Sequence, residues 1–207
     1  RDPLDFVLWH PSASDEPSWE SLWGPGRPGW HIECSALALR ELDTTIDLHG
    51  GGSDLIFPHH ECEAAQSEAA TGAPFVRHWM HQAMVRMDGE KMSKSLGNLV
   101  FVSDLRTQYD TRAIRLGIVA HHYRDSWEWN DEIMPTAAAR LDAWLAATTA
   151  PGAVDSSAAL DAVRRCLDDD LDTPGAVAVI DEAVARGEGV ASAAALLGVF
   201  LVGDPVR

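Results

Sequence analysis

Two lysines three residues apart, Lys91 and Lys94, stand in a polar segment, 89–98, that reads Gly-Glu-Lys-Met-Ser-Lys-Ser-Leu-Gly-Asn. On a flexible loop their ammonium groups can lie on both sides of a triphosphate, while the two serines offer hydroxyl groups. Such a loop would stabilise the negative charge that develops as pyrophosphate leaves. The alternative interpretation is a solvated polar loop, which is the usual role of a short Lys/Ser run.

A glycine-rich segment, 47–61, reads Asp-Leu-His-Gly-Gly-Gly-Ser-Asp-Leu-Ile-Phe-Pro-His-His-Glu. Glycines that follow a strand let a nucleotide lie against the backbone, and an aspartate in the turn can accept hydrogen bonds from ribose hydroxyls. A glycine run alone is usually only a turn. The Phe-Pro-His-His-Glu that follows makes this segment more specific, and it predicts a nucleotide-binding turn.

His59 and Glu63 are four residues apart at the start of a predicted helix, so both side chains lie on one face of it. Cys34 would have to approach from the preceding element. A thiolate, an imidazole and a carboxylate suit zinc, which prefers tetrahedral coordination, although a fourth ligand is missing. A buried thiol and a hydrogen-bonded imidazole are the alternative for each residue taken singly. His60 and Cys62 lie off this face and are expected to support the ligands or to lie at the surface.

Four stretches, 17–36, 91–98, 122–124 and 168–174, closely resemble cysteinyl-tRNA synthetase, a class I aminoacyl-tRNA synthetase. The first contains Pro-Ser-Trp-Glu-Ser and Gly-Trp-His-Ile-Glu-Cys-Ser-Ala. The second begins with Lys-Met-Ser-Lys-Ser, residues 91–95, which matches the signature loop of the class letter for letter. The last two read His-Tyr-Arg and Asp-Asp-Asp-Leu-Asp-Thr-Pro. The resemblance implies a fragment beginning midway through the catalytic domain. The family's first nucleotide-binding signature and first zinc-binding cysteine are then expected upstream, and the fragment alone should not catalyse the full reaction.

The resemblance also implies a role for particular residues, one bound zinc ion per chain, and ATP as a substrate together with Mg²⁺. Zinc would bind the thiolate of substrate cysteine, because a Zn–S bond discriminates against serine. The residues carried over are Cys34, His59 and Glu63 as zinc ligands; Trp30 and His49 in the cysteine pocket; Gly52, Ser53, Asp54, Val85 and Lys94 at the adenylate; and Lys91 and Lys94 as catalytic groups.

For the acceptor of the activated cysteine, tRNA(Cys) is the first expectation. A sister family, the mycothiol-pathway cysteine ligase, makes the same adenylate but transfers cysteine to glucosaminyl-inositol. Three features favour that family: the acidic charge, the short helical tail, and the amino-acid sequences of 98–103 and 127–129. Two residues favour the synthetase. The resemblance leads us to expect Gln in the sister family at the position of His49, and no fourth protein ligand there at the position of Glu63. A non-catalytic, synthetase-like binding module is the second alternative.

The expected fold class is α/β: the C-terminal half of a Rossmann-like class I synthetase catalytic domain, followed by an all-helical region. The expected domains are a partial catalytic domain over 1–102, a helical stem-contact region over 103–150, and a C-terminal helical domain over 151–207. Periodicity and turn signals predict helices at 31–42, 55–70, 105–120, 133–147, 158–167, 173–187 and 190–201, and strands at 46–49 and around 84–85. Thr173 is predicted to cap the helix that starts at Pro174.

The composition is acidic, with 16 Lys and Arg against 32 Asp and Glu and a formal net charge of −16. Any nucleic-acid contact therefore needs a local basic patch. The candidates are Arg106, Arg112, Arg115 and Arg124, unless these pair with the surrounding acids. Three cysteines make no disulfide framework, which favours a cytoplasmic location. The uncharged stretch 190–203 is shorter than the about 20 residues a spanning helix needs, so we expect no membrane contact. We also expect a monomer.

Overall fold

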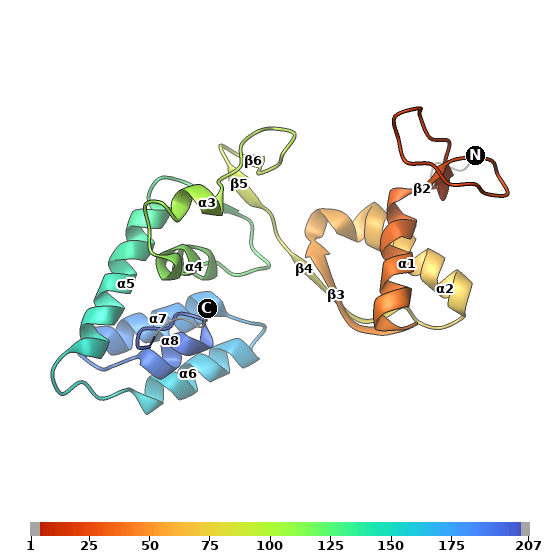
Figure 1. The fold of residues 1–207 in the computed structure, drawn as a ribbon. Helices are drawn as coiled ribbons and strands as arrows, with labels where there is room; N and C mark the ends of the chain where they lie inside the picture. Colours follow the sequence, from red (N-terminus) through yellow and green to blue (C-terminus); the bar gives the residue numbers. More distant parts are fainter. Residues whose placement is uncertain (1–4, 204–207) are drawn as a thin grey trace. The chain divides into compact units, whose positions relative to one another are not determined.

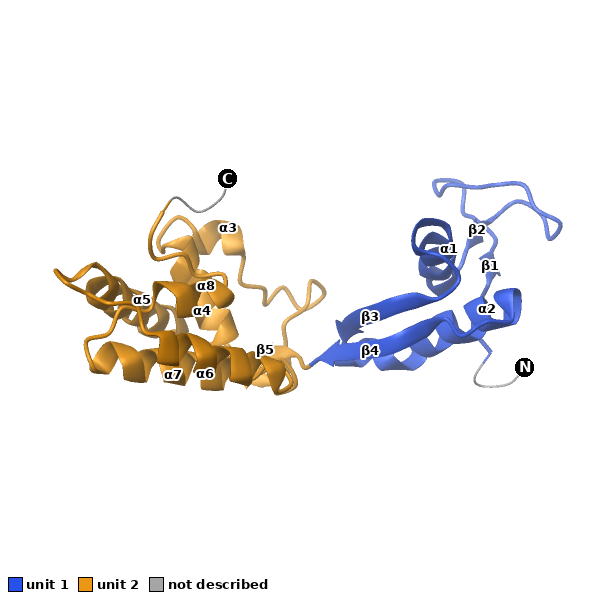
Figure 2. Cartoon of the chain, turned by 90° about the horizontal axis from the view of Figure 1, so that it is seen from below, with its two compact units in different colours: residues 1–82 blue, residues 83–207 orange. Residues whose placement is uncertain are grey.

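The computed structural model describes residues 5–203, which form two compact units within residues 1–82 and 83–207 (Figures 1 and 2). The division after Gln82 differs from the expected boundary at 102, which rests on motifs and not on packing. The three-part division of the chain stays a prediction. Within the described residues, no helix is both long and apolar enough to cross a membrane.

The first unit contains a parallel strand pair joined by a helical crossover. Strands β3 (Ile46–Gly52) and β4 (Val76–Gln82) pair in register from Ile46↔Val76 to Gly52↔Gln82, and α2 (Glu61–Thr71) connects them. Helix α1 (Trp30–Leu42) precedes β3 and packs on α2. A short antiparallel pair, β1 (Trp9–His10) and β2 (Arg27–Pro28), leads into α1. The strand–helix–strand unit is the connection that parallel strands require.

The helix expected over 55–70 is shorter than predicted. Two short helical turns, Ser53–Leu55 and Ile56–His60, come first, and α2 begins only at Glu61. The interruption lies at Phe57, whose backbone is extended (φ −138°, ψ 135°). Pro58 explains this conformation, because the proline ring sterically disfavours the helical backbone conformation in the residue that precedes it. The bend leaves His59 and His60 buried at the entrance to α2.

The second unit is mainly helical. A three-stranded sheet has the order β6-β5-β7, with β5 (Val85–Met87) antiparallel to β6 (Glu90–Lys91) and parallel to β7 (Trp127–Glu128). The helices are α3 (Val102–Leu105), α4 (Thr111–Val119), α5 (Ile133–Thr149), α6 (Ser157–Asp168), α7 (Thr173–Ala185) and α8 (Ala191–Leu196). Their apolar faces bury a common core that includes Trp144, Leu116, Ile180, Val163 and Val199.

Several predicted boundaries in this unit were wrong. The helix expected over 105–120 is divided into α3 and α4, because the Asp110 side chain accepts a hydrogen bond from the backbone N–H of Arg112 and starts a new helix. Asp172, not Thr173, caps α7 by accepting from Gly175 N at 2.9 Å. Helix α8 ends at Leu196 instead of 201, and the chain turns at Gly198, whose φ of 71° is accessible chiefly to glycine. The strand predicted within 75–87, around 84–85, is two strands: β4 ends at Gln82 and β5 begins at Val85.

Candidate metal and nucleotide site

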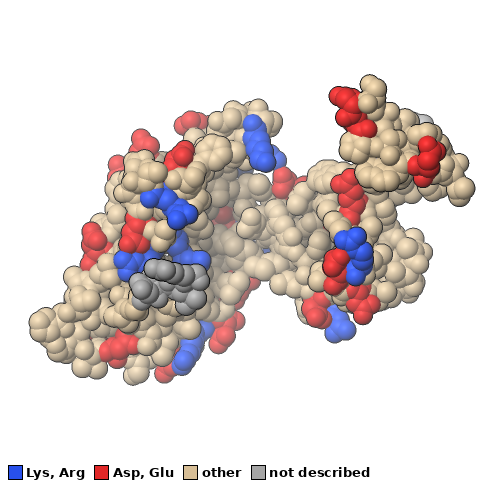
Figure 3. All heavy atoms as spheres, in the orientation of Figure 1, with Lys and Arg blue, Asp and Glu red and all other residues tan. Residues whose placement is uncertain are grey.

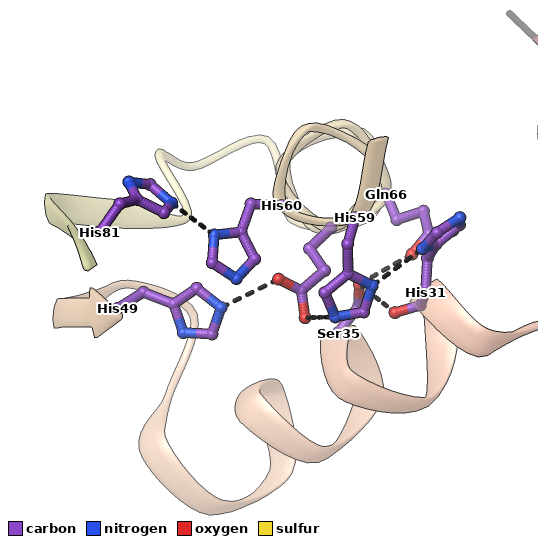
Figure 4. A network of polar contacts seen from close by, with 8 residues as sticks. His31, Ser35, His49, His59, His60, Gln66 and His81 are labelled. Atoms are coloured by element: carbon purple, nitrogen blue, oxygen red, sulfur yellow. Dashed lines mark hydrogen bonds and ion pairs between the residues drawn. The ribbon is translucent and has the colours of Figure 1, made fainter. Parts of the chain in front are cut away.

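Cys34, His59 and Glu63 meet between α1 and α2. Each offers a ligand atom, and these atoms all lie within 4.8 Å of one another. His59 Nε2 is 3.4 Å from Glu63 Oε1, across one turn at the start of α2 (Figure 4). Glu63 is fully buried and His59 is 5% exposed. The four-residue spacing therefore places two donor groups on one helix face, and the packing of α1 on α2 brings the thiol to them.

This arrangement fits a cation. Glu63 Oε1 is buried and makes no hydrogen bond in the described chain, and such an orphaned carboxylate oxygen is costly unless a positive charge faces it. Burial, followed by the nearby Glu63 carboxylate, raises the pKa of the Cys34 thiol, so without a cation the thiol is held protonated. Sulfur, nitrogen and oxygen donors together are typical of a zinc site, and an incoming Zn²⁺ would favour the thiolate.

A network of histidines surrounds these three residues. The other carboxylate oxygen, Glu63 Oε2, is 2.9 Å from His49 Nε2, and His59 Nδ1 is 2.8 Å from His31 Nδ1 (Figure 4). The contact to His31 occupies Nδ1 of His59 and leaves Nε2 directed at the carboxylate. Partners of this kind fix the ring orientation of a metal ligand. His49, His60 and Glu63 form a second group with ligand atoms within 4.8 Å of one another.

His60 and Cys62 are 4% and 5% exposed, so neither lies at the surface. His60 Nδ1 lies 2.8 Å from Nε2 of His81, which projects from β4 (Figure 4). The ring of His60 also packs on Gly51, where an added Cβ would come within 2.9 Å of its Cε1 atom. Sequence reasoning expected His60 either to support the ligands or to lie at the surface, and it missed His31 and His81 as members of this network. The available signal was the concentration of histidines between 31 and 81.

Trp30 begins α1, and its ring stacks on His59 with centroids 4.4 Å apart and an interplanar angle of 16°. The side chain is still 57% exposed. The residue expected to line a cysteine pocket therefore lies directly over a candidate metal ligand. His49, the other predicted pocket residue, reaches the same centre through Glu63.

The predicted adenylate-binding turn lies where β3 ends. Gly52 is the last residue of that strand, and Ser53 and Asp54 follow in a short exposed helical turn. Ligands of parallel sheets bind beyond the carboxyl ends of the strands, which is the position of this turn. Val85, the remaining predicted adenylate contact, is the first residue of β5 in the second unit.

The signature loop is exposed and tied to the sheet at its base. Lys91 closes β6, and the next residue donates its backbone N–H to Val85 O at 3.0 Å. Asn98 bridges the two ends of the loop: its Oδ1 accepts from Ser93 N at 2.9 Å and its Nδ2 donates to Lys91 O at 3.2 Å. Lys94 is exposed at the turn between these contacts. The base of the loop is therefore ordered by hydrogen bonds, and mobility of its tip stays a prediction.

Two of the four arginines considered for phosphate contacts pair with acids. Arg112 Nη2 lies 2.7 Å from Asp110, and Arg124 Nη2 donates to Asp170 Oδ1 at 2.9 Å. The guanidinium of Arg115 lies close to Gly198. On the face shown in Figure 3, Lys and Arg are interspersed with Asp and Glu. The charges on this face therefore do not make a continuous basic surface for nucleic acid.

Residues 1–139 match the family model described as "tRNA synthetases class I (C) catalytic domain". This match covers more than half of the chain, and the protein belongs to that family. The fold agrees: LeuRS of Agrobacterium radiobacter K84, solved in a ternary complex with tRNA and LeuAMS, superposes with a TM-score of 0.61 at 15% identity, over 87% of this chain and 31% of that one. The mixed α/β fold predicted from the sequence is thereby confirmed.

The names of the curated relatives are more specific than the description of the family. L-cysteine:1D-myo-inositol 2-amino-2-deoxy-alpha-D-glucopyranoside ligase of Nocardiopsis dassonvillei is 55% identical over 87% of this chain and 45% of the relative. The ligase of the same name from Thermobispora bispora is 53% identical over 95% and 49%. The chain thus spans about half the length of these relatives. Their name favours the sugar acceptor over the tRNA acceptor that the sequence analysis preferred.

Proposed function

We propose that this chain is part of an ATP-dependent ligase that activates cysteine as cysteinyl-adenylate and transfers it to the amino group of glucosaminyl-inositol. The similarity to ligases named for that acceptor carries the proposal. The charge of the protein supports it, because a formal net charge of −16 and arginines paired with acids suit a small acceptor better than a polyanion. The preference for tRNA drawn from His49 and Glu63 rested on two pocket residues, whereas the identity to the ligases extends over most of the chain.

In this proposal Cys34, His59 and Glu63 hold zinc. Bound zinc would supply a soft Lewis acid that prefers the thiolate of cysteine to the hydroxyl of serine. The contact to His31 orients His59, and Trp30 covers the outer face of its ring. The chain's own residues thereby orient the donor groups at a centre where a thiol can be selected.

Adenylate formation requires the carboxylate oxygen of cysteine to attack the α-phosphorus of ATP. The bond from that phosphorus to the bridging oxygen then breaks, and pyrophosphate leaves with the electron pair. Gly52, Ser53 and Asp54 would hold the adenosine part beyond the end of β3, and Val85 would contact adenine. Lys91 and Lys94 would stabilise the charge growing on pyrophosphate, and bound Mg²⁺ would supply further positive charge. Because this charge is larger in the transition state than in bound ATP, the two ammonium groups act mainly on the rate.

In the transfer step the neutral amine of the acceptor attacks the carbonyl carbon of the adenylate. An amide bond forms, the mixed anhydride bond breaks, and AMP leaves while the amine loses a proton. This second step needs no tRNA, and its acceptor brings a single nucleophilic nitrogen. The same adenylate therefore serves either acceptor, and only an assay with both distinguishes them.

The test uses the full-length natural protein with ATP and cysteine. We expect cysteine-dependent exchange of labelled pyrophosphate into ATP, little exchange with serine, and release of AMP with an amide product when glucosaminyl-inositol is added. Parallel reactions with tRNA(Cys) should give no cysteinyl-tRNA. Charging of tRNA without reaction of the amino sugar would overturn the proposed acceptor. Absence of exchange in a zinc-loaded protein would instead support a non-catalytic binding module.

A further inference from the structure

The turn between α6 and α7 makes an unusual set of contacts with a segment almost fifty residues earlier in the chain. The Asp170 carboxylate accepts from Tyr123 Oη at 2.6 Å and from Arg124 Nη2 at 2.9 Å. The backbone carbonyl of Asp170 lies 3.1 Å from His122 Nε2. Three consecutive side chains, residues 122–124, thus converge on one residue. The Arg124 guanidinium, followed by the Tyr123 hydroxyl, lowers the pKa of Asp170 to about 2, so the carboxylate is charged at neutral pH.

The backbone of this turn is strained. Asp170 and Leu171 have φ values of 53° and 57°, a left-handed conformation that residues with a Cβ rarely adopt. Hydrogen bonds on both sides hold it: Asp172 N donates to Cys166 O at 2.9 Å, and the Asp172 side chain caps α7. Exposed ion pairs contribute little to stability, so stabilisation by the Asp170–Arg124 pair does not explain why the strained backbone is kept. Strain held in this way points to a positional role.

The segment held by Asp170 aligns the strand that carries the signature loop. Tyr123 O accepts from Ala83 N at 2.7 Å, just before β5 begins. Further along, β7 pairs with β5, and Trp129 N donates to Arg86 O at 2.8 Å. The Glu128 carboxylate accepts from Gly89 N, at the turn into β6. Contacts from both ends of the segment 123–129 therefore hold the chain just before β5, β5 itself at Val85 and Arg86, and the turn into β6. The signature loop follows directly from β6.

We propose that Asp170 is a positioning residue for adenylate formation: through Tyr123 and Arg124 it fixes the strip 123–129, and hence the alignment of β5 and the base of the signature loop. This inference rests on the proposed function, since it assigns the loop to ATP. Asp170 is not among the residues proposed above to contact ATP or cysteine. Its loss should therefore misplace Lys91 and Lys94 without disturbing the cysteine and zinc centre, whose residues all lie in the other unit.

The test compares Asp170→Asn and Tyr123→Phe with wild type in the full-length natural protein. Asp161→Asn is the matched control, because Asp161 is an exposed acid on neighbouring α6 that pairs only locally with Arg164. Pyrophosphate exchange is measured while ATP and cysteine are varied separately, together with zinc content and the fraction of active sites. We expect Asp170→Asn to lower kcat and raise the ATP KM, reducing kcat/KM for ATP by about ten- to a hundredfold. The cysteine KM and zinc content should stay within about twofold of wild type, as should every parameter of the control.

The double variant Asp170→Asn with Tyr123→Phe should be no worse than the poorer single variant, because the two residues act as one unit. Equal kinetics for Asp170→Asn and the control would overturn the inference. So would a loss of exchange that merely follows the fraction of active sites with an unchanged ATP KM, since that is the result of a purely structural role. A wild-type protein without exchange activity would contradict the proposed function itself, which makes the two failures distinguishable.

Discussion

Replacing Glu63 by Gln tests whether Glu63 is a metal ligand or only a structural hydrogen-bond partner. The side chain is fully buried, with Oε2 at 2.9 Å from His49 Nε2 and Oε1 without a hydrogen bond beside His59. Glutamine has nearly the same shape and can keep the contact to His49. It removes the negative charge that the orphaned oxygen would offer a cation. The substitution should therefore act mainly on zinc affinity.

The expected change in the free energy of unfolding differs between the metal-free and the zinc-loaded protein. Without zinc, the weaker hydrogen bond to His49 and the relief from burying a carboxylate oppose each other, so stability should change by no more than about 1 kcal/mol. Loss of a carboxylate from the metal centre should weaken zinc binding by about a hundredfold. When the zinc concentration is well above the dissociation constants of wild type and variant, a hundredfold weaker affinity removes about 2.7 kcal/mol of zinc-linked stabilisation.

The assay is chelator competition for the zinc Kd, together with unfolding midpoints in zinc and in EDTA. Glu61→Gln is the matched control, because Glu61 is an exposed carboxylate two residues away on the same helix. We expect the control to bind zinc as wild type does. Equal losses of stability in zinc and in EDTA, with an unchanged zinc Kd, would refute the reasoning and leave Glu63 as a structural partner of His49.

Three further outcomes are expected. Lys94→Ala should lower kcat of pyrophosphate exchange by on the order of 10²-fold while zinc content stays at the wild-type level, as measured by exchange kinetics and metal analysis. Asp181→Ala should destabilise the helical unit by about 1–3 kcal/mol in denaturant unfolding, because the buried Trp144 Nε1–H, now 2.7 Å from Asp181, loses its acceptor, whereas Asp181→Asn keeps one. The Asp170 pKa is lowered from 3.8 to about 2, so its stabilising effect is complete above about pH 4 and is lost as the pH falls through 2. The difference between wild type and Asp170→Asn in acid unfolding should therefore vanish at the lowest pH.

Local spacing was enough to predict several parts of this protein. The i,i+4 relation of His59 and Glu63 predicted a shared helix face, and the structure brings Cys34 to the same point. The alternation of strands and helices predicted the α/β class, and the Lys-Met-Ser-Lys-Ser string indicated the synthetase class. These features depend on backbone geometry within a few residues, or on a long specific motif. Both are readable without knowing which distant segments meet.

Tertiary structure decided which buried polar groups face each other. His60 meets His81 because β4 lies beside β3, and His31 meets His59 because α1 packs on α2. Asp170 reaches Arg124 from the α6–α7 turn, where Asp170 and Leu171 adopt a left-handed conformation that residues with a Cβ disfavour. Periodicity reports which face of an element is apolar, but not which partner that face meets. Pairing across long separations is set by the packing of whole elements. This is why the contacts of the histidine network, and the particular acid that pairs with Arg124, emerged only from the folded chain.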